Sequence, residues 1–219
     1  MKNIAIDGPA GAGKSSIAKL VAKNLGIVYV DTGAMYRTMA LACLKDGIDV
    51  SDEGKVSEKV QGVDISIDYQ DGTQHIFLGK DDVSTEIRQE EVGKTASGIA
   101  RYAAVRSKLV ALQQELARKQ DVIMDGRDIG TVVLPDAYLK IYLTASSKVR
   151  AERRYKELIE KGEKCDIDEI EKDIIARDEQ DMNREVSPLK QADDAVLVDT
   201  SDMSIDQVVG RIMELYDAD

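Results

Sequence analysis

The chain has 219 residues, of which 43% are hydrophobic and 32% are charged, and its formal net charge is -11. This length supports one substantial hydrophobic core with smaller appended lobes. The negative charge argues against nonspecific binding to a nucleic acid polymer or to an anionic membrane surface, so any phosphate-binding surface has to be local.

Aromatic residues and cysteines narrow the class further. The chain has no Trp and only one Phe, Phe77, which leaves few platforms for stacking the bases of single-stranded nucleic acid. Cys43 and Cys165 lack metal-ligand spacing and are expected to be reduced thiols. The amino terminus lacks the features of a signal peptide, and no later run reaches membrane-spanning length. We therefore expect a cytoplasmic protein.

Short apolar runs alternate with helical patterns along the chain. The helical spacing of Ile17, Val21 and Leu25 ends at Gly26, a good stop signal, and Ser204 and Gln207 have capping-box spacing at the start of the last helix. Each run is continuously apolar, as expected for strands covered on both faces. The sequence thus predicts an α/β fold with a mostly parallel sheet. The strand-like runs are 4–7, 27–31, 122–125, 139–143 and 195–199.

The first strand-like run leads into a phosphate-binding motif. GPAGAGKS has the G-x-x-x-x-G-K-[ST] spacing of a P-loop and stands between a predicted strand and a predicted helix. Glycines let backbone N–H groups face a polyphosphate, and the helix N-terminus adds partial positive charge. Lys14 is expected to bridge the outer phosphates, and Ser15 to bind Mg²⁺. The expected ATP-binding residues here are Gly8, Pro9, Ala10, Gly11, Ala12, Gly13, Lys14, Ser15 and Ser16.

Two segments depart from the strand and helix alternation. Residues 64–79 hold two strand-like runs around Asp71-Gly72, a strong hairpin signal, which suggests a small inserted domain that we place at 63–102. The stretch 146–184 has highly charged helices and is expected to form a weakly packed lid, at 148–170. We treat residues 1–219 as one unit that carries both. The lone His75 falls on the hairpin and receives no catalytic role.

The stretch VIMDGRDIGTVV, residues 122–133, places charges at the end of an apolar strand. One interpretation is a salt-bridged turn, and the other is a ligand site at the edge of the sheet. Asp125 would orient Mg²⁺ and its water, or serve only as a cap. Because the chain has no Asn-Lys pair, the guanine-reading motif of small GTPases is absent from the sequence and that class is disfavoured.

Four further blocks carry a resemblance to a known family. They are DTGAMYR at 31–37, DVSTEIR at 82–88, DGRDIGTVVLPDA at 125–137 and RDEQDMNREVSPL at 177–189. Together with the P-loop and the hairpin, their order and spacing resemble bacterial cytidylate kinases over essentially the whole chain. The resemblance implies a five-stranded parallel P-loop kinase core, a monophosphate-binding insertion and a helical lid. It also implies transfer of the γ-phosphoryl group of ATP to CMP or dCMP with Mg²⁺.

The resemblance assigns roles to individual residues of this chain. Lys14 belongs to the catalytic set, and the acceptor phosphate would be held by Arg37, Arg127 and Arg184. The cytosine would face Ser97, Arg106 and Asp128. The ribose would meet Arg177 and Asp181, and the same site would be lined by Thr32 and Tyr36. The family's lid arginines correspond to the cluster Arg150, Arg153 and Arg154, without a decision on which of them reaches phosphate. Mg²⁺ would be bound by Ser15 and Asp125.

The chemistry of these residues agrees with the roles. The acceptor phosphate is already ionised, so catalysis rests on alignment and charge neutralisation, which arginines and Mg²⁺ supply. Cytosine presents an N4 donor beside an N3 acceptor, and uracil presents the reverse. A carboxylate of Asp128 with a donor from Arg106 or Ser97 therefore fits cytosine and opposes uracil. For any one arginine taken alone, a solvated face or a surface ion pair is the more ordinary interpretation.

Alternatives stay open at this point. Another small-molecule P-loop kinase, such as a uridylate or dephospho-coenzyme A kinase, would share the fold. A regulatory nucleotide-binding ATPase is a different class, and would hydrolyse ATP slowly regardless of any monophosphate. Gln180 and Met182 occupy places that are often basic in the family, which leaves the contacts of the lid with ATP undecided. We expect a monomer, because no helix shows a second apolar face.

Overall fold

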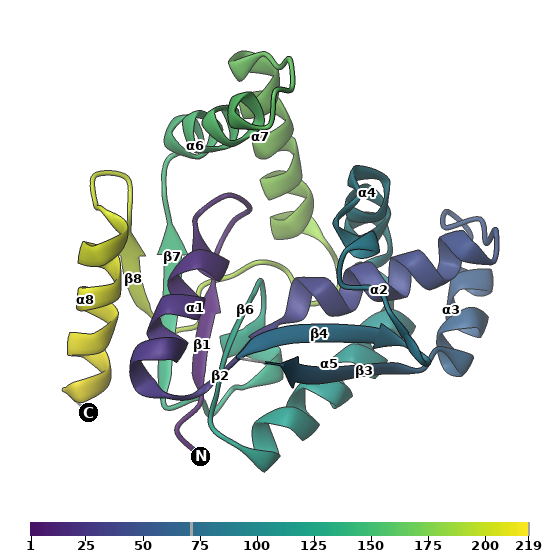
Figure 1. The fold of residues 1–219 in the computed structure, drawn as a ribbon, viewed down its shortest axis with the longest axis horizontal. Helices are drawn as coiled ribbons and strands as arrows, with labels where there is room; N and C mark the ends of the chain where they lie inside the picture. The colour runs from purple at the N-terminus through teal and green to yellow at the C-terminus, as the bar shows by residue number, and fades with distance from the viewer. Residues whose placement is uncertain (71, 219) are drawn as a thin grey trace.

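The computed structural model describes residues 1–70 and 72–218. A five-stranded sheet forms the centre of the molecule (Figure 1), and every strand pair in it is parallel. The predicted parallel α/β sheet is confirmed. Its strand order is β2-β6-β1-β7-β8. The strands are β1 (Ile4–Asp7), β2 (Val28–Asp31), β6 (Val122–Gly126), β7 (Leu139–Thr144) and β8 (Val196–Asp199).

Burial differs between the central strands and the edges of this sheet. All four residues of β1 are buried, because β6 and β7 flank the strand and helices cover both faces. On the edge strand β8, in contrast, Leu197 is 56% exposed. The expectation that all five strands are covered on both faces is therefore wrong for β8: Val198 packs into the core on one face, and the face that carries Leu197 is not covered.

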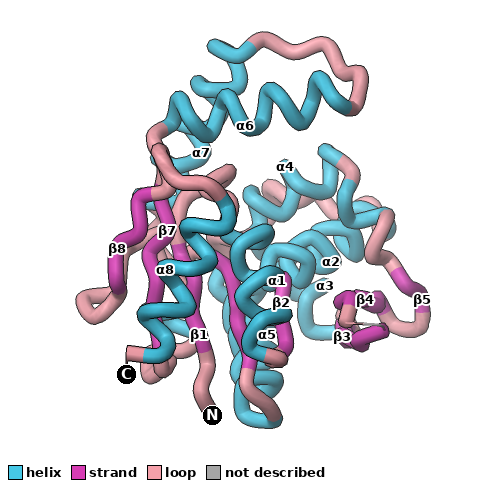
Figure 2. The backbone as a smooth tube through the Cα atoms, turned by 60° about the vertical axis from the view of Figure 1, so that its left-hand side comes forward, coloured by secondary structure: helices cyan, strands magenta, loops and turns pink. Residues whose placement is uncertain are grey.

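Helices form a layer on each face of the sheet, as Figures 1 and 2 show. Helices α1 (Lys14–Leu25) and α8 (Ile205–Asp217) pack over a core that contains Ile4, Ile6 and Ile123. Helices α2 (Thr32–Lys45) and α5 (Ala103–Lys119) pack over the other core, around Ala5 and Met124. The predicted helix ends are confirmed: Gly26 caps α1 with a φ of 67°, and Ser204 and Gln207 form the capping box of α8.

A second, antiparallel sheet lies beside β2. It consists of β3 (Ile65–Gln70), β4 (Thr73–Leu78) and the short β5 (Asp81–Asp82). This confirms the predicted hairpin, although Asp71 of its turn lies outside the described residues. The hairpin is joined to β2 by Tyr69, whose hydroxyl donates to the Tyr29 carbonyl (3.0 Å), and by Gln74, which accepts from the Asp31 N–H (2.8 Å). The segment is flanked by α3 (Glu53–Gly62), the 3₁₀ turn η1 (Glu86–Arg88) and α4 (Glu90–Ile99).

Helices α6 (Ser147–Glu160) and α7 (Ile167–Asn183) pack on each other beyond the end of the sheet where the P-loop lies (Figure 1). The buried residues of the two helices are Arg150, Ala151, Asp178 and Asp181, so Ala151 is the one apolar side chain among them. The expected helices are therefore present, and the expectation that they form a weakly packed lid stays a prediction. Within the described residues, no helix is long and apolar enough to cross a membrane.

Candidate functional site

A cavity of about 860 Å³ lies at the carboxyl ends of the strands. Ligands of open α/β sheets bind at this edge, because loops from several strands converge there. The wall includes the P-loop, the first turns of α2, parts of α4 and α5, the loop after β6, and the facing sides of α6 and α7. One cavity thus brings together segments that are far apart in the sequence.

The P-loop backbone has the conformation that its glycines predict. Gly8, Gly11 and Gly13 have φ angles of 149°, 75° and 89°, which other residues rarely adopt. A Cβ atom on Gly8 would stand 1.9 Å from the Leu143 carbonyl oxygen, so no side chain fits there. Because Gly13 is the N-cap of α1 and has no side chain, the first N–H groups of this helix stay available for an anion.

Lys14 is buried beside this loop. Its Nζ atom donates to the Pro9 carbonyl oxygen at 2.8 Å, which folds the side chain back along the P-loop. Burial lowers the pKa of Lys14, and the positive charge of Arg127 lowers it further. A bound polyphosphate would oppose both effects, because its negative charge favours the charged ammonium group.

Asp125 ends the buried part of β6 and joins three neighbouring segments. Its carboxylate accepts from the Ser15 hydroxyl and from the Tyr29 hydroxyl, each at 2.8 Å, and its carbonyl oxygen accepts from Thr32 (2.6 Å). Burial raises the pKa of Asp125, and the nearby Asp31 adds to the effect. Its side chain therefore does more than cap a turn: it stands next to the P-loop hydroxyl.

The residues present fit Mg²⁺, which prefers hard oxygen ligands and keeps several of its waters. Ser15 and Asp125 supply one hydroxyl and one carboxylate, the set used when substrate phosphates complete the coordination shell. Among the described residues there is no group of three or more histidine, cysteine or acidic side chains that could hold a metal without such help.

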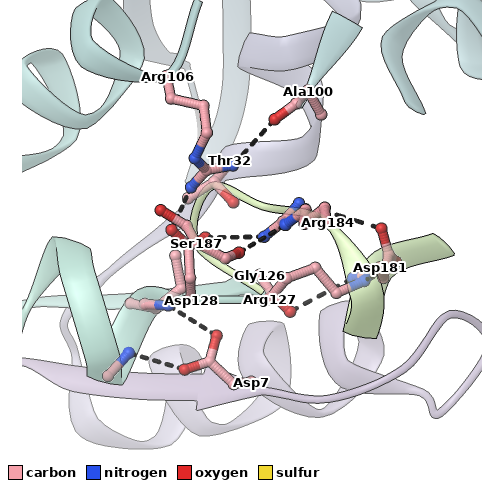
Figure 3. Close-up of polar contacts among 12 residues, drawn as sticks. Asp7, Thr32, Ala100, Arg106, Gly126, Arg127, Asp128, Asp181, Arg184 and Ser187 are labelled. Carbon is pink, nitrogen blue, oxygen red and sulfur yellow. Dashed lines mark hydrogen bonds and ion pairs between the residues drawn. The ribbon is translucent and has the colours of Figure 1, made fainter. Parts of the chain in front are cut away.

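Arg127 and Asp128 line the cavity, and each of them also forms an ion pair with a different residue (Figure 3). The Nε atom of Arg127 donates to Asp181 at 2.8 Å, and a buried ion pair joins Asp128 to Arg106. Arg184 lies near both carboxylates, at 3.7 Å from Asp128 and 4.0 Å from Asp181. The two interpretations of this stretch are therefore compatible: its charges form salt bridges, and those salt bridges line a cavity.

Several buried polar atoms in this region have no hydrogen-bond partner. In the described part of the chain there are five such side-chain atoms, and four of them belong to residues that line the cavity. They are Tyr36 Oη, Arg106 Nε, Gln113 Nε2 and Arg184 Nη2. Unpaired buried polar groups are costly, so their concentration in one cavity indicates a polar ligand.

Two further predicted arginines reach the same space. Arg37, on α2, donates to the Ile87 carbonyl oxygen at 3.4 Å, and Arg177, on α7, also lines the cavity. The pKa of each guanidinium is lowered, first by burial and then by neighbouring arginines. This clustering of positive charge stands out in a chain with a net charge of -11.

The three arginines on α6 have different surroundings. Arg150 is buried, donates to the Ala10 carbonyl oxygen of the P-loop (3.0 Å) and pairs with Asp178 on α7 (2.7 Å). Arg153 donates to Thr200 (2.8 Å), and Arg154 pairs with Glu157 in the next turn (2.9 Å). All three line the cavity.

The structure brings nearly every predicted site residue to this cavity, with the exception of Gly8 and Pro9 in the P-loop. The Ser97 carbonyl oxygen accepts a hydrogen bond from the Gln180 side chain (3.3 Å). His75 lies on β4, hydrogen-bonded to Asp82 (2.7 Å) and away from the cavity lining.

Sequence reasoning did not single out Gln113, Tyr29 or Asp7. Gln113 had one recognisable signal, since it follows Arg106 by two helical turns and so shares its buried face on α5. Tyr29 lies within a strand-like run, where a tyrosine is ordinary. Asp7 had a visible signal in the sequence, because it is the charged last residue of the first apolar run.

Comparison with solved structures shows a P-loop kinase fold. A gluconokinase from Sinorhizobium meliloti 1021 aligns with a TM-score of 0.50 and 16% identity, over 99% of this chain and 91% of that chain. A sugar kinase from Janibacter sp. HTCC2649 aligns with a TM-score of 0.51 and 14% identity, over 99% and 95%. At these identities the likeness concerns the fold alone.

Comparison at the sequence level is much closer. The family model for cytidylate kinase matches residues 4–218. A cytidylate kinase from Caldicellulosiruptor bescii is 50% identical over 214 residues, 98% of this chain and 95% of that one. One from Leuconostoc mesenteroides is also 50% identical over 214 residues, 98% of this chain and 96% of that one. The resemblance inferred from the motifs is confirmed, and the chain belongs to the cytidylate kinase family.

Proposed function

We propose that this protein transfers the γ-phosphoryl group of ATP to CMP or dCMP, giving ADP and CDP or dCDP. The observation that carries the proposal is a single cavity in which a P-loop faces a buried Arg106–Asp128 pair. The first feature suits the donor's polyphosphate, and the second suits a base that has a donor beside an acceptor. Family membership supports the same reaction.

Base selection follows from hydrogen-bond complementarity. The Asp128 carboxylate accepts from the N4 amino group of cytosine, while Arg106 or Ser97 donates to N3. Uracil presents a carbonyl oxygen to the carboxylate and an N–H to the donor, so both contacts become repulsive. The buried atoms Arg106 Nε and Tyr36 Oη, which lack partners in the described residues, supply further hydrogen-bonding capacity on the same wall.

Arginines align the acceptor phosphate with the P-loop. Arg37, Arg127 and Arg184 bind its oxygens, for which the planar guanidinium group is well matched. Arg177 and Asp181 meet the ribose. Binding changes the existing contacts, since Arg127 shares its charge between Asp181 and the phosphate. No general base is required, because the attacking phosphate oxygen is already ionised.

Lys14 and the α6 arginines serve the donor side. Lys14 turns from the Pro9 carbonyl oxygen to the transferring phosphates, and the cluster Arg150, Arg153 and Arg154 approaches them from α6. Mg²⁺, held by Ser15 and Asp125 when it is bound with ATP, neutralises charge on the phosphate oxygens. The side chains listed above orient both nucleotides and exclude water from between them.

We assign the two appended segments to substrate binding within a single unit of residues 1–219. The insertion 63–102 carries η1 and α4, which border the acceptor end of the cavity, and is proposed as the monophosphate-binding domain. The segment 148–170 is proposed as a lid that closes over the phosphates. Because Ala151 is the one apolar residue among the buried residues of α6 and α7, a movement of these helices would expose little apolar surface, which supports the proposal.

The proposal includes a monomeric assembly and a cytoplasmic location. All groups named above come from one chain, so a monomer suffices for the reaction. Cys43 and Cys165 are free thiols, which is usual in a reducing compartment and supports a cytoplasmic location.

A coupled assay of ADP release tests the proposal over CMP, dCMP, UMP, AMP, GMP and shikimate. We expect rapid ADP release with CMP or dCMP and much slower release with the other acceptors. No turnover with either cytidine nucleotide would refute the proposal. Faster turnover of UMP than of CMP would favour a uridylate kinase, and ATP hydrolysis that ignores every acceptor would favour a regulatory ATPase.

A further inference from the structure

Asp7 is a buried carboxylate at the centre of the site, and the roles proposed above do not use it. It is the last residue of β1, in register with Gly126 of β6 on one side and Tyr142 of β7 on the other. Its exposed fraction is 4%, and Gly8 of the P-loop follows it directly. A charge at such a position needs a physical reason, since ionised groups are costly to bury.

The reason lies in the turn that follows Asp128. The two carboxylate oxygens of Asp7 each accept one backbone N–H, from Ile129 and from Gly130, both at 2.7 Å (Figure 3). These are the first N–H groups of η2, the π-helical turn Ile129–Val133. The first N–H groups of a helical turn have no partner inside the turn, and Asp7 provides one from another strand.

The residue that would normally provide such a cap is Asp128. It occupies the N-cap position of η2, where an aspartate side chain commonly accepts from N–H groups one to three residues ahead. In the described part of the chain the Asp128 side chain makes no such bond and pairs instead with Arg106. Because Asp7 occupies the N–H groups, the carboxylate of Asp128 stays directed at Arg106 and at the cavity.

Close packing holds the turn against β1. A Cβ atom on Gly130 would lie 3.2 Å from Lys140 Cδ and 3.4 Å from the Asp7 carboxylate, so even a methyl group would force a small shift. Burial raises the pKa of Asp7 to about 6, while the N–H groups of Gly130 and Ile129 lower it in part. The fold thus keeps a carboxylate where an uncharged residue would be easier to bury.

We propose that Asp7 is a positioning residue for recognition of the acceptor base. It caps the turn 129–133 in place of Asp128, and so leaves the Asp128 carboxylate free to read the cytosine amino group. As the neighbour of Gly8 it also ties this turn to the P-loop, so that donor and acceptor sites share one rigid connection. This inference rests on the proposed CMP kinase function.

The test compares selectivity for the base in three proteins. Asp7→Asn keeps the shape of the side chain but replaces one acceptor oxygen by an NH₂ group, which leaves one N–H of the turn to compete for Asp128. We expect the ratio of kcat/KM for CMP to kcat/KM for UMP to fall about tenfold. The matched control is Asp121→Asn, because Asp121 also accepts a distant backbone N–H, from Lys2 (2.8 Å), but at the other end of β6. Its ratio should equal that of the wild type.

A merely structural role gives a different pattern, with lower thermal stability and an equal loss for both acceptors. An unchanged ratio in folded Asp7→Asn would overturn the inference while leaving the function intact. If Asp7→Asn does not fold, Gly130→Ala takes its place, with an expected fall of about threefold, and an unchanged ratio would count equally against the inference. A wild type without turnover of cytidine nucleotides would overturn the proposed function, and this inference with it.

Discussion

Asp128 combines burial, charge and position in a way that makes it the most informative side chain of the site. It is 4% exposed, pairs with Arg106 and has Arg184 at 3.7 Å. Two arginines thus surround one carboxylate, whose oxygens accept hydrogen bonds. A carboxylate oxygen at this place is matched by an amino group and opposed by a carbonyl oxygen.

The first prediction concerns the loss of the Asp128 carboxylate. Asp128→Ala should lower the ratio of kcat/KM for CMP over UMP by about 10- to 100-fold, because the contact that opposes uracil is lost. The ratio for Asp128→Asn should lie between the ratios for Asp128→Ala and for the wild type, since the Asn amide still accepts through one oxygen. Steady-state kinetics with both acceptors measures the ratio, and an unchanged value for Asp128→Ala would remove this residue from base recognition.

A second prediction concerns Asp125 and the ion requirement. Asp125→Asn weakens the oxygen donor beside Ser15, so the Mg²⁺ concentration for half-maximal turnover should rise at least about tenfold. ATP binding measured by calorimetry without Mg²⁺ should change little in the same variant. Equal Mg²⁺ dependence in variant and wild type would show that Asp125 acts only through its hydrogen bonds to Ser15, Tyr29 and Thr32.

Asp7 gives a third prediction, on stability and pH. Its pKa is about 6 in the folded protein against 3.8 ordinarily, so the folded state holds this proton more tightly. The contribution of Asp7 to the free energy of unfolding should therefore fall as the pH rises from about 4 to about 6, and then level off. Asp7→Asn lacks this contribution, so its stability relative to the wild type should increase by up to about 3 kcal/mol over this range. Urea unfolding at pH 4.5 and 7.5 measures the difference in the free energy of unfolding between Asp7→Asn and the wild type. This difference would be the same at both pH values if the charge of Asp7 did not destabilise the folded state.

At this scale the sequence was informative where a residue type has one main use. A lysine and a serine at the end of a glycine-rich loop, and charges at the end of an apolar strand, pointed to the site directly. Gln113 and Tyr29 were missed, because a buried amide or tyrosine is recognised only when its partners are known. The capping of Asp128's own turn by Asp7 joins residues more than 120 positions apart, which no local pattern reveals.

At the scale of elements, the site depends on segments of unequal stability. The P-loop and the turn 129–133 rest on the most buried strands, whereas α6 and α7 are held largely by polar contacts. Arg150 is central to these contacts, since it links α6 to Ala10 in the P-loop and to Asp178 on α7. We expect such an arrangement to keep the P-loop and the turn 129–133 fixed and to let α6 and α7 move.

The fourth prediction follows from this difference. With a non-hydrolysable ATP analogue and CMP together, amide hydrogen exchange in 148–183 should slow, because the helices are then held closed over both nucleotides. Either ligand alone should have a smaller effect, and β1 and β6 should exchange slowly in every state. Identical exchange of 148–183 with and without both ligands would argue against closure.

Continuous apolar runs and stop signals predicted the strands and helices well, because burial and capping are local requirements. The hairpin was equally visible from its turn. Edge strand β8 was misjudged, since the run 195–199 is as apolar as its neighbours and the order of strands in the sheet is a property of the whole fold. Strand β5 is the third strand of the antiparallel sheet and consists only of Asp81 and Asp82, so it is too short to have a sequence pattern.

At the scale of the whole molecule, a chain with net charge -11 concentrates its arginines around one cavity. Repulsion among them is balanced by Asp125, Asp128 and Asp181 in the same walls. The sheet order places β1 and β6 side by side, so that the P-loop and the turn 129–133 follow adjacent strands. The order of the motifs along the chain indicated this arrangement through the family resemblance. The cavity itself could be described only once the fold was known.

The most direct test of the central claim follows the label from [γ-³²P]ATP in the presence of CMP. We expect the label to appear in CDP at the rate at which ADP forms, and release of inorganic phosphate to be at least about 100-fold slower, because water is excluded from the closed site. Label that appeared chiefly in inorganic phosphate, at a rate independent of CMP, would contradict it.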